Sequence, residues 1–284
     1  MNSKSPRAKS AGAFCFFKYL LPMRVFDFDS AIVRTPGKSV VDGIRSDAAA
    51  VPDCEGVLAE HAAYIAALRA AGLDVDILPP LEDFPDSVFV EDPALVFPEG
   101  AILLRPGVAA RLGEAEHLRE PLNRHFDRVL ALEGDEYADG GDVLVTPDAV
   151  LIGLSKRTTR KGAQALARKL AELGRAARIV ETPDRVLHFK TASSLLSEDT
   201  VMVTRALAAT GAFAGLEILL VPDGEEGAAN FLRINDAVFV GAHFRRTIDL
   251  LTAQDFNVVP LAIAQIAKLD AGLSCMSLRW RAAR

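Results

Sequence analysis

One pattern recurs along this chain and restricts the folds available to it. A polar residue opens a short apolar run, a tight turn follows, a second apolar run returns, and a helical stretch comes next; residues 90–104, 140–153, 188–203 and 227–240 show this pattern. Each segment has Pro, Asp, Asn or Gly at its turn, where these residues set the backbone dihedral angles of a β-hairpin. The predicted turns are Pro98-Glu99-Gly100, Pro147-Asp148, Glu198-Asp199 and Asn235-Asp236.

The polar residues that open these segments are spaced by roughly 40 to 50 residues, which is the range of repeated supersecondary units. They are Asp92, Asp142, Thr191, Asn230 and Cys275. An N-terminal strand over residues 25–34 and a C-terminal strand over 274–280 could form a fifth unit together. Five similar units closing a ring would place their opening residues around one central cavity. An α+β domain without internal symmetry is the alternative.

Helical periodicity lies between the predicted hairpins. Apolar residues recur on one face over residues 54–71 and again over 162–173, and Gly72 and Gly174 end these two stretches. Further helices are predicted to start after Arg111 and after Thr247. The sequence therefore predicts an α/β protein with a single domain over residues 23–284.

Composition excludes several classes of function. The formal net charge is −6 and no Lys/Arg-rich stripe is present, so we expect no nucleic-acid partner. The chain has three cysteines, an odd number, and no Cys/His spacing typical of zinc. We therefore expect no metal, no disulfide framework and a reducing, cytoplasmic environment.

The N-terminus carries an apolar run from Ala11 to Leu21 that Lys18 interrupts. The run is too short to span a bilayer, so no membrane association is expected. We interpret residues 1–22 as an N-terminal extension upstream of a natural start at Met23. An export signal and a packed N-terminal arm are the alternatives.

Two residues suggest nucleophilic catalysis. Cys275 follows a predicted turn at the start of a short strand, and His188 opens a hairpin, whereas the other histidines lie in helical patterns or beside arginines. A nucleophilic cysteine needs such an acid–base partner and a low thiol pKa. A lone cysteine is more often a small buried hydrophobe, and a lone histidine more often structural.

Acidic residues supply candidates for the remaining roles. Asp139 or Asp142, in Asp-Gly-Gly-Asp, could orient the histidine, because the two glycines let the backbone approach closely. Asp86, Glu91 and Asp92 lie on a largely apolar segment, where buried acids need partners. A substrate guanidinium could provide the partner through its planar fork of donors, and salt bridges to protein arginines are the alternative.

Six motifs in order along the chain resemble dimethylarginine dimethylaminohydrolases of the guanidino-group modifying, or pentein, superfamily. They cover nearly everything from residue 25 to 280, and each alone is weak. The matching stretches are 34–43 (RTPGKSVVDG), 84–93 (FPDSVFVEDP), 139–142 (DGGD), 153–158 (GLSKRT), 187–190 (LHFK) and 273–277 (LSCMS). The resemblance implies a five-bladed ββαβ propeller with pseudo-symmetry, in agreement with the five predicted units.

The resemblance also implies hydrolysis of asymmetric dimethylarginine or monomethylarginine to citrulline and a methylamine, through a covalent thiouronium intermediate and without a cofactor. It assigns Cys275 as nucleophile, His188 as acid–base group and Asp139 as orienting carboxylate. The implied substrate contacts are Glu91 and Asp92 to the guanidinium, Asp86 to the α-amino group, Arg111 and Arg157 to the carboxylate, and Ile44 and Leu269 at the pocket. The partner is thus a small molecule, and a homodimer is left open.

Two other activities remain as alternatives. One is deimination of arginine or agmatine, or amidino transfer. Deiminases typically carry an additional helical domain for which this chain has no room, and agmatine lacks the carboxylate that two arginines would bind. The other is a pentein that binds without catalysis, which the joint presence of Cys275, His188 and Asp139 disfavours.

Overall fold

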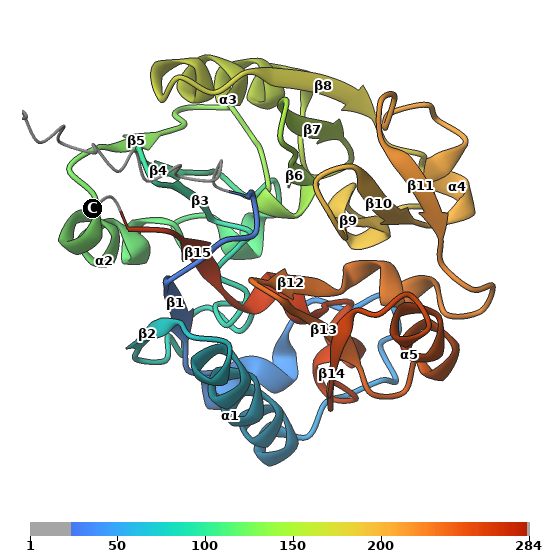
Figure 1. The fold of residues 1–284 in the computed structure, drawn as a ribbon. Helices are drawn as coiled ribbons and strands as arrows, with labels where there is room; N and C mark the ends of the chain where they lie inside the picture. The colour runs from blue at the N-terminus through green and yellow to red at the C-terminus, as the bar shows by residue number, and fades with distance from the viewer. Residues whose placement is uncertain (1–23, 283–284) are drawn as a thin grey trace, which may run out of the picture.

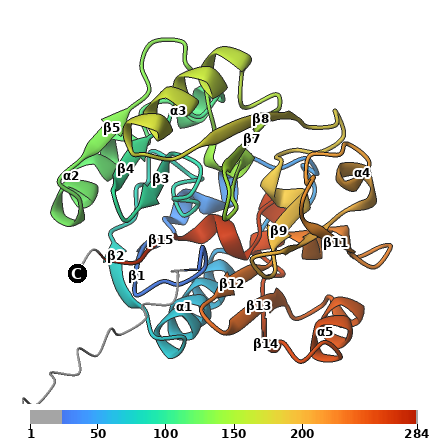
Figure 2. The same ribbon diagram turned by 45° about the horizontal axis from the view of Figure 1, so that its top comes forward.

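The computed structural model describes residues 24–282, and the extension expected at residues 1–22 lies outside the described residues. Five three-stranded sheets lie around a central axis, and the helices pack on the outside of this ring (Figures 1 and 2). Within residues 24–282, no helix has the length and apolar character needed to cross a membrane.

Each unit has the order strand, strand, helix, strand. The first unit contains β3 (Ala94–Phe97), β4 (Gly100–Leu103), α2 (Glu116–His125) and β5 (Val129–Ala131). The second contains β6 (Val143–Val145), β7 (Val150–Leu154), α3 (Arg160–Glu172) and β8 (Ala177–Glu181). The third contains β9 (Ser193–Leu195), β10 (Thr200–Val203), α4 (Arg205–Ala208) and β11 (Glu217–Leu220). The fourth contains β12 (Leu232–Ile234), β13 (Ala237–Gly241), α5 (Arg245–Thr252) and β14 (Asn257–Leu261).

The fifth unit joins the two ends of the chain, as predicted. It contains β15 (Leu278–Trp280), β1 (Ser30–Arg34), α1 (Cys54–Ala70) and β2 (Asp74–Leu78). β1 pairs antiparallel with β15, with Ser30 opposite Trp280, and parallel with β2. In every unit the middle strand has one antiparallel and one parallel neighbour, and the helix makes the crossover to the parallel strand. The four predicted hairpins and the five-unit α/β ring are confirmed.

The hydrophobic core is divided into five clusters, one at each contact between neighbouring units. For example, Leu118 and Leu122 of α2 in the first unit pack with Leu278 and Trp280 of the fifth. The other four clusters likewise combine residues of two adjacent units. Because no unit buries its apolar face alone, the five units form a single domain.

Two helix starts differ from the prediction. α2 begins at Glu116 rather than directly after Arg111, because Gly113 has a φ of +95° and interrupts the helix. α5 begins at Arg245, before Thr247, and the backbone N–H of Thr247 in its first turn donates to Glu225 Oε2 at 2.8 Å. A first-turn N–H has no partner within its own helix, so a carboxylate from another segment stabilises this start.

Both terminal strands are shorter than predicted. Residues before Ser30 form a turn, in which the N–H of Asp27 donates to the carbonyl of Arg24. Residues 273–276 form a 3₁₀ turn, η7 (Leu273–Met276), and the strand begins only at Leu278. Cys275 therefore lies on a helical turn rather than in a strand.

Similar 3₁₀ turns precede three other sheets, namely η3 (Gly140–Asp142), η4 (Lys190–Ala192) and η5 (Glu226–Asn230). These turns and η7 carry four of the five predicted opening residues. A 3₁₀ turn directs its side chains around a short axis, whereas a strand would alternate them between the two faces of the sheet.

Candidate active site

A pocket within the ring gathers most of the residues that the sequence singled out. It encloses about 430 Å³ of empty space, part of it open to solvent, which suits a small ligand. Eight of the ten predicted site residues line it: Ile44, Asp86, Asp92, Arg111, Arg157, His188, Leu269 and Cys275. Phe89, Leu187 and Thr191 are among the further lining residues. Asp139 lies behind His188, and Glu91 lies outside this lining.

Cys275 presents its thiol at the inner end of η7. Its backbone N–H donates to the carbonyl of Gly272 at 3.3 Å, and its carbonyl accepts from the N–H of Glu91 at 3.2 Å. The side chain is buried, and Asn230 Nδ2 lies 3.5 Å from Sγ. Burial raises the pKa of the thiol, while the positive charge of Lys190 opposes this rise.

His188 and Asp139 form a buried ion pair, with 3.4 Å between Nε2 and Oδ2. Burial by itself lowers the pKa of His188, but the negative charges of Asp139, Asp92 and Asp142 outweigh this and raise it to about 9. The His188 imidazole is therefore protonated at neutral pH, and the ion pair holds the pKa of Asp139 well below its usual range. The arrangement can supply a proton to a leaving group.

The two glycines of the Asp-Gly-Gly-Asp motif allow the close backbone approach that the sequence suggested. A Cβ atom on Gly140 would lie 1.9 Å from the carbonyl oxygen of Glu91. A Cβ atom on Gly141 would lie 2.8 Å from Nδ1 of His188. The motif can therefore place Asp139 beside His188 only when both intervening residues lack side chains.

Asp142, the alternative partner for His188, accepts hydrogen bonds from two hydroxyls and one backbone N–H instead. Its Oδ2 accepts from Ser155 Oγ at 2.6 Å and from Thr158 Oγ1 at 2.7 Å. Its Oδ1 accepts from the backbone N–H of Phe189 at 2.8 Å. Asp142 thus fixes the segment that carries His188, and Asp139 contacts the imidazole.

Asp92 contacts a protein cation in the pocket, because Arg111 forms an ion pair with it through Nη1. Burial and the neighbouring charge of Asp139 nevertheless raise the pKa of Asp92 to about 7. Donor atoms of Asp92, Asp139 and His188 lie within 4.8 Å of one another, close enough to bind a metal ion. The ion pair of Arg111 with Asp92 already places a positive charge at this cluster, which opposes the binding of a metal cation there.

The two arginines predicted to bind the substrate carboxylate differ in their burial and in their ion pairs. Arg111 is buried, and Glu114 accepts from its Nε and Nη2, both at 2.7 Å. Its Nη2 also donates to the carbonyl of Phe89 at 3.1 Å. Since Asp92 takes one hydrogen of Nη1, one N–H of this guanidinium is left for a ligand. Arg157 is half-buried, and its guanidinium forms no ion pair with any residue in the range 24–282.

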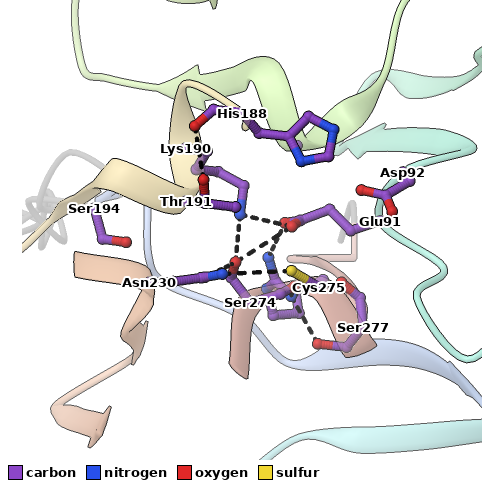
Figure 3. Close-up of polar contacts among 12 residues, drawn as sticks. Glu91, Asp92, His188, Lys190, Thr191, Ser194, Asn230, Ser274, Cys275 and Ser277 are labelled. Carbon is purple, nitrogen blue, oxygen red and sulfur yellow. Dashed lines mark hydrogen bonds and ion pairs between the residues drawn. The ribbon is translucent and has the colours of Figure 1, made fainter. Parts of the chain in front are cut away.

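Glu91 lies outside the lining of this pocket and pairs with two protein cations, and its contact with a substrate guanidinium stays a prediction. Lys190 Nζ lies 2.6 Å from its Oε2, and Arg279 Nη2 lies 2.8 Å from its Oε1. Two protein cations already satisfy this carboxylate beneath the pocket (Figure 3). The alternative interpretation, a salt bridge within the protein, therefore describes Glu91 in this structure.

Ile44 lines the pocket and belongs to residues 43–46, a segment that we call the strap. The backbone N–H of Ile44 donates to both oxygens of Asp86, at 3.0 and 3.2 Å. Two residues further on, the N–H and the hydroxyl of Ser46 donate to Asp270, at 2.6 and 2.8 Å. Burial raises the pKa of Asp86. Asp86 thus links the strap to the pocket floor, while Leu269 lies buried beside it.

Sequence reasoning missed several charged residues of the site. Lys190, Arg279 and Glu114 are buried or nearly so, yet neither periodicity nor spacing indicated their roles. The signal for Lys190 was its position two residues after His188, within a hairpin opening. Asn230 was identified only as an opening residue, and the structure places its amide beside the thiol.

Comparison with known proteins gives consistent results. A family model described as Arginine deiminase matches residues 79–219. An N(G),N(G)-dimethylarginine dimethylaminohydrolase of Pseudomonas aeruginosa is 35% identical over 254 residues, covering 89% of this chain and 100% of that protein. One of Streptomyces coelicolor is 32% identical over 253 residues, covering 88% of this chain and 96% of that protein.

Solved structures agree with this result. A mutant of the Pseudomonas aeruginosa enzyme complexed with citrulline superposes with a TM-score of 0.86 at 35% identity, covering 89% of this chain and all of that one. The N-terminal domain of the arginine dihydrolase ArgZ from cyanobacteria matches at 17% identity with a TM-score of 0.77, over 88% of this chain and 96% of that domain. This second likeness concerns the fold alone. On the evidence of its five-unit ring, its pocket and its relatives, the chain belongs to the dimethylarginine dimethylaminohydrolase family of the pentein superfamily.

Proposed function

We propose that this protein hydrolyses free Nω-methylated arginine, as asymmetric dimethylarginine or monomethylarginine, to citrulline and a methylamine. The observation that carries the proposal is that one pocket combines a thiol with a protonated imidazole. Cys275 and His188 both line it, and Asp139 fixes the imidazole from behind. Relatives that cover nearly the whole chain bear the name of this activity.

Substrate charge matches the charged groups of the pocket. Asp92 pairs with the substrate guanidinium, Asp86 with the α-amino group, and Arg157 with the carboxylate, helped by the remaining N–H of Arg111. Ile44 and Leu269 close the pocket around the aliphatic part. Asp92 keeps its pair with Arg111 through Oδ2 and binds the substrate guanidinium through its other oxygen, so neither protein charge is left unpaired.

The reaction proceeds in two steps. The positive charge of the bound substrate favours loss of the Cys275 thiol proton to solvent water, and the resulting thiolate attacks the guanidinium carbon. The C–N bond to the methylated nitrogen breaks, and His188 gives its proton to the departing amine. Water then adds to the thiouronium carbon, and the neutral imidazole accepts one water proton. The C–S bond breaks as the second water proton passes to the leaving sulfur, which releases citrulline and restores the thiol. The scheme requires no metal or organic cofactor.

A second candidate is deimination of unmethylated arginine, which the Arginine deiminase family match favours. The same residues could release ammonia instead of a methylamine, so the methyl groups alone separate the two activities. Contacts to one or two methyl groups discriminate by roughly 10- to 200-fold in kcat/KM. The apolar lining residues Phe89 and Leu187 are where we expect this discrimination to arise.

Citrulline release tests both candidates. Purified protein is incubated separately with asymmetric dimethylarginine, monomethylarginine and arginine, and we expect citrulline from the methylated substrates and none after Cys275→Ser. Citrulline mainly from arginine would favour the deiminase. Substantial turnover by Cys275→Ser would exclude the covalent scheme, and the absence of citrulline from all three would favour a binding protein.

Two further expectations are part of this proposal. The free, half-buried Cys54 and the free, buried Cys275 suit a reducing, cytoplasmic environment, which cell fractionation can test. A homodimer stays a prediction, and sedimentation equilibrium at two protein concentrations would decide it.

A further inference from the structure

The sulfur of Cys275 has a polar neighbour that the reaction scheme above does not use. Asn230, on η5 of the fourth unit, is buried and places Nδ2 3.5 Å from Sγ. Figure 3 shows contacts that link Lys190, Ser274 and Asn230, and a further contact that links Asn230 to the sulfur of Cys275. A buried thiolate needs hydrogen-bond donors because it has lost those of water.

An asparagine amide can donate or accept, so its orientation decides its effect on the sulfur. Lys190 Nζ contacts Ser274 Oγ, and an ammonium can only donate. Ser274 must therefore accept from Lys190, which leaves its own hydrogen free to donate elsewhere.

The hydroxyl of Ser274 has two acceptors within reach. Asn230 Oδ1 lies 2.5 Å from Ser274 Oγ, whereas Glu91 Oε2 lies 3.3 Å away and already accepts from Lys190. The hydrogen thus goes to Asn230 Oδ1. Since Oδ1 accepts there, the NH₂ end of the amide is the end that faces Sγ.

The anchor of this chain of hydrogen bonds is Glu91. It holds Lys190 at 2.6 Å and is itself held by Arg279 at 2.8 Å. Donation then runs in one direction only, from Lys190 to Ser274, from Ser274 to Asn230, and from Asn230 to the sulfur. A donor directed at sulfur stabilises the thiolate relative to the thiol.

We propose that Asn230 is a positioning residue that donates an amide hydrogen to the sulfur of Cys275 and stabilises its thiolate, with Ser274 and Lys190 fixing the amide in that orientation. The inference rests on the proposed role of Cys275 as nucleophile. It explains why Glu91 is buried beneath the pocket with two cations instead of facing the substrate.

The test is the pH dependence of Cys275 alkylation by iodoacetamide without substrate, followed by mass spectrometry of the peptide that contains Cys275. Asn230→Asp removes the donor and adds a negative charge beside the sulfur, and both changes raise the alkylation midpoint, by about one pH unit or more. Ser274→Ala adds no charge, so it isolates the effect of the directed donor. Ser274→Ala leaves Asn230 in place but frees its amide to rotate, and we expect a smaller rise of about half a pH unit.

Ser277→Ala is the matched control. It removes a second buried hydroxyl three residues from Ser274, which contacts Tyr64 at 2.5 Å and Arg279 at 2.7 Å but not the sulfur. A general loosening of this segment would affect Ser277→Ala as well, whereas the proposal leaves its midpoint at the parent value.

A parent-like midpoint in Ser274→Ala would overturn the proposal, and so would a parent-like midpoint in Asn230→Asp. If Asn230→Asp does not fold by circular dichroism, the midpoint of Ser274→Ala decides alone. Failure of this inference is distinguishable from failure of the proposed function. Unchanged midpoints alongside citrulline release that depends on Cys275 would overturn only the role of Asn230, whereas citrulline release by Cys275→Ser would overturn the proposed function.

Discussion

Four buried acids around the pocket contact buried or nearly buried cations, and this pairing contributes to the chemistry of the site residue by residue. The pairs are Glu91 with Lys190 and Arg279, Asp139 with His188, and Asp92 and Glu114 with Arg111. A buried charge without a partner is strongly destabilising, so these pairs keep the charges in place before substrate arrives. Their consequences can be measured one side chain at a time.

The charge state of His188 is the first such consequence. Its pKa of about 9 means that the imidazole keeps its proton up to that pH and loses it above. We expect kcat/KM to fall above about pH 9, because a neutral imidazole cannot protonate the leaving amine. Nuclear magnetic resonance of labelled histidine in Cys275→Ser should give a His188 midpoint near 9, and a midpoint near 6.5 would contradict the ion pair with Asp139.

Glu114 provides a prediction on stability. Its carboxylate forms two hydrogen bonds with the buried guanidinium of Arg111, so Glu114→Gln leaves a buried cation with less compensation. We expect a loss of roughly 3 kcal/mol in the free energy of unfolding, measured with urea. The control is Glu116→Gln, whose side chain is 63% exposed and pairs with Arg119, and we expect a loss below about 1 kcal/mol. Equal losses in the two variants would show that the buried pair of Glu114 with Arg111 contributes no more to the free energy of unfolding than an exposed pair.

At the scale of elements, a 3₁₀ turn before a hairpin recurs at the centre of the ring. Two of these turns carry Asn230 and Cys275, and His188 comes two residues before a third, so three different units contribute to one place while the strands that follow carry the core. The hairpin turns lie further out, and one of them also connects units. Asn235, in the turn between β12 and β13, has a φ of +53° and bonds to segments of the fifth unit.

Asn235→Ala should therefore cost more than an ordinary turn substitution. The amide of Asn235 bonds the N–H of Phe28 at 2.8 Å, its carbonyl at 3.0 Å and the carbonyl of Ala71 at 2.9 Å. Losing these bonds and placing alanine at positive φ should reduce the free energy of unfolding by about 3 kcal/mol. Asn235→Gly keeps the backbone conformation and should lose somewhat less.

Asp236→Ala is the control for this turn. Its side chain is 85% exposed, so urea unfolding should change by no more than about 0.5 kcal/mol. A loss in Asp236→Ala as large as that in Asn235→Ala would mean that the turn, and not the amide contacts, is responsible.

For the whole molecule, closure of the ring depends on pairing between the two ends of the chain. β15 contributes three residues to the fifth sheet, and its Trp280 packs on Phe126 of the first unit with 5.0 Å between ring centroids. Each unit buries its apolar surface against both neighbours, so detaching one unit, such as the fifth, exposes two core clusters. Such an arrangement favours cooperative unfolding.

This predicts a single transition. Trp280 is the sole tryptophan of the sequence, so its fluorescence reports on the junction between the fifth and first units. We expect fluorescence and far-ultraviolet circular dichroism to give the same urea midpoint. A fluorescence transition at lower urea would show that the β1–β15 unit opens before the rest of the ring.

Local patterns in the sequence were sufficient to predict the repeated hairpins and their turns, the two long helices and the ring of five units, and they led to the prediction of Cys275 and His188 as partners. These features follow from neighbours along the chain, because turn residues, apolar periodicity and spacing act over a few residues or over one repeat. The starts of α2 and α5 were wrong, because Gly113 and the carboxylate of Glu225 decided them.

Only the tertiary structure decided which partner each buried charge contacts. Glu91 could equally have faced a substrate guanidinium, and Arg279, 188 residues further along, engages it instead. Asp139 rather than Asp142 contacts His188. The carboxylate oxygens of Asp142 instead accept hydrogen bonds from Ser155, Thr158 and Phe189. The amide of Asn230 meets a sulfur 45 residues away. Electrostatic and hydrogen-bond partners depend on distance in space. Closing the ring brings together residues that are far apart along the chain, so their contact cannot be predicted from the local sequence.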